Sequence, residues 1–183
     1  MILSTWSNTS LEDVAVANGD GLRWSQLNVY KDKQFMLRYI RRIERAGFKA
    51  IVMTIDCPIK GKMRNPALKL PAHLQFANIT SNIQSATLKN KDLFSIVVEL
   101  KSLTITWEDV DWVCSVTSLP IVLKGILTRE DAMIALQHNV QGILVSNHGA
   151  RQLDEVQATV SNIVVIIHHS LSLPLDLLVR CTL

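Results

Sequence analysis

The alternation of short apolar runs with amphipathic or capped segments limits this chain to few folds. The apolar runs are typical of buried strands, and the segments between them have helical spacing or helix-capping patterns. We expect strands at residues 2–6, 23–30, 49–56, 119–125 and 140–145, a short helix after Thr9 or Ser10, and further helices at residues 32–46, 107–114 and 128–137. This order predicts parallel strands joined by right-handed crossovers.

The helix expected at residues 32–46 has the clearest signal. Phe35, Leu37, Ile40 and Ile43 recur near helical spacing between basic residues, and Gly47 follows where a left-handed cap is common. For the other helices we expect N-caps at Thr9 or Ser10, at Thr106 and at Thr128.

Five strands of this kind suit either an open doubly wound sheet or part of an eight-stranded (β/α) barrel. No Gly-rich phosphate loop follows a strand, which disfavours the dinucleotide-binding fold. Polar or aromatic residues stand at the end of each strand: Ser4, Trp6, Gln26, Asn28, Thr54, Asp56, Lys124, Ser146 and His148. Strand ends are wetter than strand centres in any sheet. Repetition over five strands nevertheless favours an active site at the carboxyl end of a barrel.

Two reactive residues follow the last expected strand, in the stretch 146–154. His148 suits proton transfer near neutral pH, and Arg151 offers two donors in the geometry of a carboxylate. Together they suggest a site that binds an organic acid and removes a proton from it. The alternative is a histidine that only hydrogen-bonds locally in a Gly-flanked turn, beside a solvated arginine.

Composition excludes several other classes of function. The 183 residues suffice for one globular domain, and 48% of them are hydrophobic. The net charge of +3 comes without a basic stripe, and no apolar run is long enough for a membrane span, so neither nucleic acid nor a membrane is expected as a partner. Cys57, Cys114 and Cys181 have no metal-ligand spacing, adjacent His168 and His169 diverge, and no metal site is expected.

The sequence Ser-Asn-His-Gly-Ala-Arg-Gln-Leu-Asp at 146–154 closely resembles the signature of the FMN-dependent alpha-hydroxy-acid oxidases and dehydrogenases, the glycolate-oxidase family. The resemblance runs to about residue 156 and weakens between residues 62 and 104. It implies an α/β fold, an incomplete (β/α)8 TIM barrel of five strands, or six if residues 175–179 count. Residues 1–156 would then form a partial barrel with a long variable loop at 60–104, and residues 157–183 a diverged tail.

The resemblance implies FMN as the cofactor. Ser4, Gln26 and Thr54 would hydrogen-bond the flavin, and Lys124 would lie beside the N1 and O2 edge of its ring. A fixed positive charge there stabilises the anionic reduced flavin.

It also implies the catalytic and substrate-binding residues. His148 would be the base, whether for the Cα proton or the hydroxyl proton, and Asp56 would hold its imidazolium. Arg151 would bind the substrate carboxylate and Trp6 would wall the pocket. Asn28 occupies a catalytic position where the family usually has tyrosine, and it is too short to replace that hydroxyl.

The implied reaction is the oxidation of an (S)-2-hydroxy acid to the 2-oxo acid, with oxygen as the expected acceptor. Lys62 and Met63 stand where the family has paired arginines, and neither a strand before Met1 nor the phosphate-binding segments of the last two strands is found. We therefore expect this chain alone to be weakly active or inactive. One alternative is a non-catalytic truncated isoform or pseudogene product that at most associates with a full-length relative. Another is a barrel isomerase or aldolase that uses Lys124 as a Schiff base.

The resemblance implies a small 2-hydroxy acid as ligand, a homo-oligomer and a peroxisomal location. The terminal Cys-Thr-Leu does not match the peroxisomal Ser-Lys-Leu signal, which leaves the cytoplasm as the other expected location.

Overall fold

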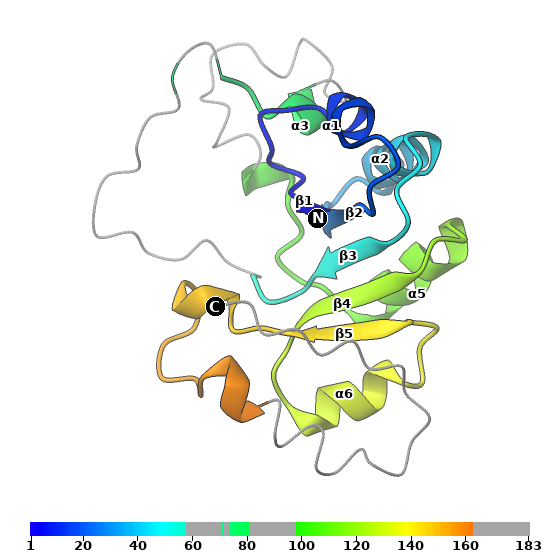
Figure 1. The fold of residues 1–183 in the computed structure, drawn as a ribbon. Helices are drawn as coiled ribbons and strands as arrows, with labels where there is room; N and C mark the ends of the chain where they lie inside the picture. The colour runs from blue at the N-terminus through cyan, green and yellow to red at the C-terminus, as the bar shows by residue number, and fades with distance from the viewer. Residues whose placement is uncertain (58–70, 72–73, 81–97, 163–183) are drawn as a thin grey trace. The chain divides into compact units, whose positions relative to one another are not determined.

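The computed structural model describes residues 1–57, 71, 74–80 and 98–162. The chain divides into two compact units (Figure 1). The first unit comprises residues 1–51 and 62–102, and the second comprises residues 52–61 and 103–183. The strand order in the sheet is β1-β2-β3-β4-β5, so the strands neighbour one another in chain order.

The strands of the first unit are shorter than expected. β1 (Ile2–Leu3) and β2 (Trp24–Asn28) pair in parallel. Tyr30, expected inside the second strand, instead makes an isolated antiparallel bridge to Lys101. The difference arises because side-chain polarity carries little information on where the backbone ladder stops.

The helices of the first unit begin where the sequence predicts. α1 (Leu11–Asn18) follows the N-cap Ser10, whose Oγ accepts a hydrogen bond from the backbone N–H of Asp13 at 3.0 Å. α2 (Lys33–Arg45) follows the N-cap Asp32, and Gly47 adopts the expected left-handed conformation with φ of 73°. The apolar stripe of α2 is buried and forms the core of this unit: Phe35, Met36, Tyr39, Ile40 and Ile43.

The range 60–104, expected to be a long loop, includes the short helix α3 (Ala77–Thr80) and further helical residues at 98–100. The Asn78 side chain is fully buried and accepts a hydrogen bond from the backbone N–H of Leu11 at 2.8 Å, which satisfies the start of α1. Glu12 of α1 is paired with Arg42 of α2 at 2.8 Å, and Arg42 also donates to the Asn78 carbonyl at 3.2 Å. α3 therefore contacts α1 and α2 within the first unit.

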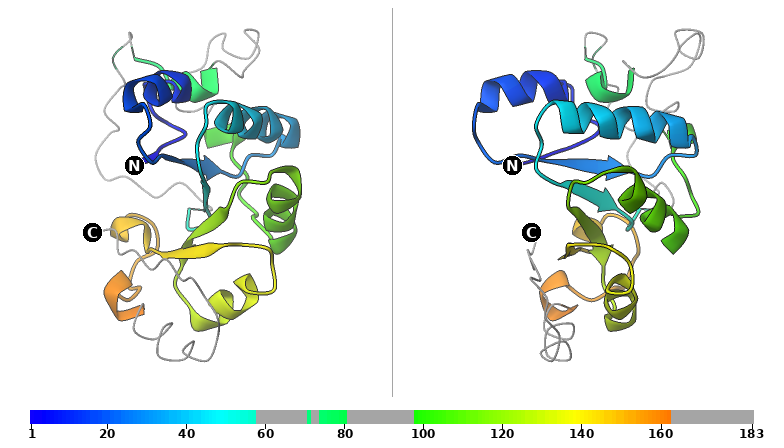
Figure 2. Two further views of the ribbon diagram at one scale, coloured as in Figure 1. Left: turned by 45° about the vertical axis from the view of Figure 1, so that its right-hand side comes forward. Right: turned by 90° about the vertical axis from the view of Figure 1, so that its right-hand side faces the viewer.

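The second unit has the same order of strand and helix. β3 (Ile51–Thr54) enters it at Val52, and after it come α5 (Trp107–Val116), β4 (Ile121–Ile126), α6 (Arg129–Ala135) and β5 (Gly142–Val145). Figure 2 shows α5 and α6 beside β4 and β5. Thr106 and Thr128 are the N-caps, as predicted, and the Thr128 Oγ accepts from the backbone N–H of Asp131 at 3.1 Å.

β4 contains a β-bulge at Gly125. β4 and β5 pair in parallel, with Lys124 opposite Leu144 and Ile126 opposite Val145, so Gly125 has no partner. Ile126 therefore takes the ladder position that residue 125 would have in a regular strand. The bulge ends the alternation of β4 immediately after Lys124.

Several predictions fall on residues 58–70 and 163–183, which lie outside the described residues: the sixth strand at 175–179, the His168–His169 pair, and Lys62 with Met63. Within the described residues, no helix combines the length and the apolar character needed to cross a bilayer.

Candidate active site

One carboxylate of the second unit binds two basic side chains. Asp56 Oδ2 accepts a hydrogen bond from Lys124 Nζ at 2.8 Å, and Asp56 Oδ1 lies 2.6 Å from His148 Nδ1. Lys124 Nζ and His148 Nδ1 are 3.4 Å apart. We call these three residues the Asp56 cluster. Asp56 and His148 follow the ends of β3 and β5, and Lys124 lies near the end of β4. The sequence placed all three at strand ends, and the structure brings them into contact.

The Asp56 carboxylate is ionised although it is largely buried. Its side chain is 5% exposed, and burial alone raises the pKa of a carboxyl group. Hydrogen bonds from His148 and Lys124, together with their positive charges, outweigh that effect and hold the pKa of Asp56 below its usual value. The cluster therefore contains a fixed negative charge that can stabilise a protonated imidazole.

The distances also decide which ring nitrogen of His148 carries a hydrogen. Nδ1 is 0.8 Å closer to the Asp56 oxygen than to the Lys124 ammonium, so Nδ1 donates to the carboxylate. In the neutral imidazole the lone pair then lies on Nε2. The side chain is 24% exposed, and Nε2 is the ring nitrogen whose lone pair can accept a proton.

Three consecutive left-handed residues present the imidazole. His148, Gly149 and Ala150 have φ values of 60°, 65° and 56°, and they form the short 3-10 segment η2 (His148–Ala150). The left-handed conformation costs an L-residue about 1–2 kcal/mol. Ser146 Oγ accepts from the backbone N–H of His148 at 3.0 Å, and Asn147 Oδ1 accepts from that of Ala150 at 3.2 Å. These two side chains hold the strained turn, as is common at functional sites.

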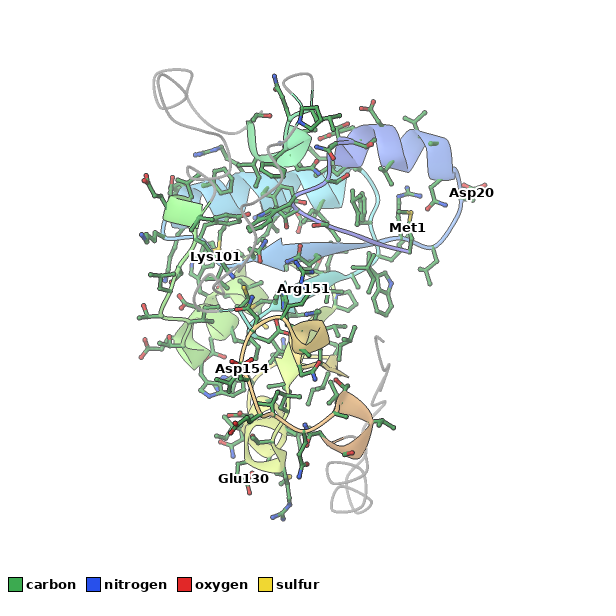
Figure 3. All side chains as sticks on the ribbon, turned by 90° about the vertical axis from the view of Figure 1, so that its left-hand side faces the viewer. Met1, Asp20, Lys101, Glu130, Arg151 and Asp154 are labelled. Atoms are coloured by element: carbon green, nitrogen blue, oxygen red, sulfur yellow. The ribbon has the colours of Figure 1, made fainter. Side chains whose placement is uncertain are left out.

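Arg151 directly follows this turn and is exposed. Figure 3 labels it together with Asp154 on the loop after β5. His148 and Arg151 thus belong to one loop, as the sequence predicts, and neither is buried in the interior.

Two predicted flavin-binding residues, Ser4 and Gln26, lie in the first unit at the ends of the paired strands β1 and β2. Ser4 Oγ accepts from the backbone N–H of Trp6 at 3.1 Å, and Gln26 Oε1 accepts from that of Thr5 at 3.0 Å. Both side chains therefore also fix the local backbone.

Trp6 and Asn28 converge on the hydroxyl of Tyr30 in the first unit. Trp6 Nε1 lies 3.4 Å from that oxygen, and Asn28, which is buried, also hydrogen-bonds it. Burial raises the pKa of Tyr30, and the two hydrogen bonds offset this only in part, so the phenol stays protonated. The role of Asn28 and Trp6 in catalysis or substrate binding remains a prediction.

The donor types fit the cofactor that the sequence implies. Ser4 and Thr54 carry hydroxyls, Gln26 a carboxamide and Lys124 an ammonium, and these suit the carbonyl and ring-nitrogen acceptors of a flavin. Thr54 is buried, whereas the Lys124 side chain is 20% exposed. Within residues 1–57, 71, 74–80 and 98–162, no group of three His, Cys, Asp or Glu side chains is placed to hold a metal ion.

Sequence reasoning assigned no role to Gly125 or to the turn-forming Asn147. A glycine inside an apolar strand pattern is a known indication of a bulge, and this signal identifies Gly125. The three left-handed residues had a weaker signal, the single Gly149.

Comparison with known families matches residues 1–175 to the FMN-dependent dehydrogenase model. Among curated proteins, 2-hydroxyacid oxidase 1 of Mus musculus is 43% identical over 169 residues, which cover 87% of this chain and 45% of that protein. Glycolate oxidase 1 of Oryza sativa subsp. indica is 46% identical over 167 residues, which cover 88% of this chain and 45% of that protein. The chain thus spans about 45% of the length of these relatives.

Solved structures give the same result. A mandelate oxidase variant with (S)-mandelic acid superposes with a TM-score of 0.79 at 36% identity, covering 97% of this chain and 47% of that one. A Pediococcus acidilactici protein described as a putative lactate oxidase has a TM-score of 0.81 at 30% identity and covers 98% and 47% of the two chains. Another mandelate oxidase structure holds an FMN adduct. The predicted fold class is confirmed, an α/β chain whose five parallel strands make an incomplete (β/α)8 barrel.

Proposed function

Because this chain belongs to the FMN-dependent dehydrogenase family, we propose that it carries out the FMN-dependent oxidation of an (S)-2-hydroxy acid to the 2-oxo acid, with oxygen as the acceptor. The observation that supports this most is the Asp56 carboxylate, which binds His148 and Lys124 at once. It gives the site a base with a counter-charge and a neighbouring fixed cation.

In this proposal His148 takes a proton from the substrate at Nε2. The imidazolium that forms keeps its Nδ1–H on the Asp56 carboxylate, so the developing positive charge meets a negative charge already in place. General-base catalysis of this kind contributes about 10²–10⁴-fold to a rate. The exposed guanidinium of Arg151, on the same loop, binds the substrate carboxylate through two parallel hydrogen bonds.

When bound, FMN supplies the acceptor for the two electrons of the substrate. Lys124 would hold its ammonium at the polar edge of the ring, where it would favour negative charge. Ser4, Gln26 and Thr54 would hold the ring by hydrogen bonds. Trp6 forms a wall of the substrate pocket. Asn28 occupies the position of the catalytic tyrosine of the family, but its side chain is too short to replace the tyrosine hydroxyl.

The test is to purify the chain with excess FMN, record its visible spectrum, and add glycolate or a longer 2-hydroxy acid without oxygen. We expect bound flavin that bleaches slowly with substrate, since the chain spans 45% of the length of its relatives. The variant H148Q should keep the flavin and lose the bleaching. Absence of bound flavin, or equal bleaching by H148Q, would contradict the proposal.

The family also motivates a peroxisomal location and a homo-oligomeric state for this chain. Fluorescence microscopy of a tagged chain beside a peroxisomal marker tests the first, and analytical ultracentrifugation tests the second. A diffuse cytoplasmic signal would contradict the peroxisomal location. A monomeric sedimentation coefficient would contradict the homo-oligomeric state.

A further inference from the structure

The bulged residue of β4, Gly125, lies directly against Asp56. Its φ of 116° is in the range that L-residues with a side chain rarely adopt. A Cβ added to Gly125 would lie 2.4 Å from Asp56 Cβ, 2.8 Å from Asp56 Cγ and 2.8 Å from the Asp56 backbone nitrogen. All three distances are shorter than real Cβ contacts, so no side chain fits here unless Asp56 moves.

Hydrogen bonds on both sides of this contact leave Asp56 little room to move. The backbone N–H of Ile55 donates to the Lys124 carbonyl at 2.9 Å, which holds the end of β3 against β4. The two carboxylate oxygens are engaged by Lys124 and His148. A methyl group at position 125 would therefore press on the Cβ and Cγ atoms of Asp56 and so displace the Asp56 carboxylate.

We propose that Gly125 is a positioning residue of the candidate site: its bulge and its lack of a side chain let the Asp56 carboxylate lie between Lys124 and His148. Three observations of the backbone and packing agree on this, namely the register shift, the positive φ and the Cβ contacts. The catalytic meaning of the role rests on the proposed function, but the geometric claim does not.

The bulge also explains how the Lys124 ammonium and the Asp56 carboxylate can lie in contact. In a regular strand, residue 125 would pair with Val145, and its side chain would face away from Lys124. Since Ile126 takes that ladder position instead, Lys124 remains the last residue of β4 on its face before the bulge. The carboxylate of Asp56 can then approach within 2.8 Å of Lys124 Nζ.

The test uses G125A with G142A as the matched control. Gly142, on the neighbouring strand β5, has ordinary space for a Cβ, whose nearest neighbours would be Val122 atoms at 3.5 and 3.8 Å. Two readouts of the whole chain need neither flavin nor substrate. One is the downfield ¹H NMR signal of the His148 Nδ1–H bound to the carboxylate, assigned by its loss in H148Q. The other is the pKa of Asp56 from ¹³C NMR of labelled aspartate.

We expect G125A to lose the His148 signal and to raise the pKa of Asp56, while G142A keeps both at the parent values. A folded G125A with unchanged signal and pKa would overturn the proposal. If G125A does not fold, it is combined with D56G, which removes two of the three atoms that the new methyl would meet. Recovery of a folded D56G/G125A chain supports the proposal, and failure of that chain while D56G alone folds overturns it.

These readouts separate the inference from the proposed function. Loss of the His148 signal in G125A supports the positioning role even if the parent chain binds no flavin. Flavin bleaching that is equal in the parent and G125A, with the His148 signal retained, would leave the proposed function standing and remove the role of Gly125.

Discussion

Substituting the central carboxylate in D56N should reduce stability in a way that depends on pH. The amide has the same shape as the carboxylate, but it loses the negative charge and one of the two accepting oxygens. Asp56 accepts two charge-assisted hydrogen bonds, at 2.8 Å from Lys124 and 2.6 Å from His148. Each such bond is worth about 1.5–3 kcal/mol.

One of the two bonds can survive in D56N as a weaker neutral bond, and water can partly solvate Lys124, whose side chain is 20% exposed. We therefore expect the free energy of unfolding to fall by about 2–4 kcal/mol near neutral pH, less than the sum of both bonds. Because the folded chain holds the pKa of Asp56 below its unfolded value, this stabilisation is complete above the unfolded pKa and is lost as the pH falls through the folded value.

The assay is urea unfolding followed by tryptophan fluorescence, for the parent and D56N, from neutral pH down to about pH 2, because an unfolded aspartate has a pKa of about 3.9 and the folded pKa of Asp56 lies below its usual value. The control is D20N, which removes an exposed carboxylate in the turn after α1. The difference between parent and D56N should be largest near neutral pH and shrink on acidification. The reasoning is refuted if D56N matches D20N within about 0.5 kcal/mol, the usual range for surface substitutions, or if the difference grows with acid.

Other substitutions near the site have separate expected outcomes. In stopped-flow measurements of flavin bleaching, H148Q should lose about 10²–10⁴-fold in rate because glutamine accepts no proton. R151M should raise the half-saturating substrate concentration roughly ten- to hundredfold, as expected for one lost charge-assisted contact, and R151K should lie between it and the parent. A150G should raise the urea midpoint, since relief of the φ of 56° is worth about 1–2 kcal/mol and exceeds the entropic cost of glycine. The same change inside α6, A132G, should lower the midpoint.

Helix starts were predictable because a short polar side chain at the N-cap acts over only three residues. Ser10, Thr106 and Thr128 cap helices as expected, and Asp32, expected as the first residue of its helix, is the N-cap of α2. Strand ends were not predictable from the sequence, because an apolar run can continue after the hydrogen-bonded ladder has stopped. Ile55, for example, still donates a hydrogen bond to Lys124 although β3 ends at Thr54.

Of the contacts in the Asp56 cluster, the sequence predicted one, between Asp56 and His148, and the catalytic roles of these residues stay predictions. Strand-end positions and the family signature selected Asp56, Lys124 and His148, and the predicted pairing of Asp56 with His148 agrees with the 2.6 Å distance. The sharing of that carboxylate with Lys124 was not foreseen. It accompanies the bulge at Gly125, which a glycine inside an apolar strand pattern can indicate, but the sequence does not give the contacts that the bulge allows.

The left-handed backbone conformation of residues 148–150 restricts which amino acids this loop can tolerate. Branching at Cβ makes this backbone conformation especially unfavourable, so valine, isoleucine and threonine are excluded at position 150, although it is exposed and contributes no chemistry. A library randomised at residue 150 should yield folded clones enriched in glycine, asparagine and aspartate. Surface exposure is therefore a poor guide to mutational freedom beside this histidine.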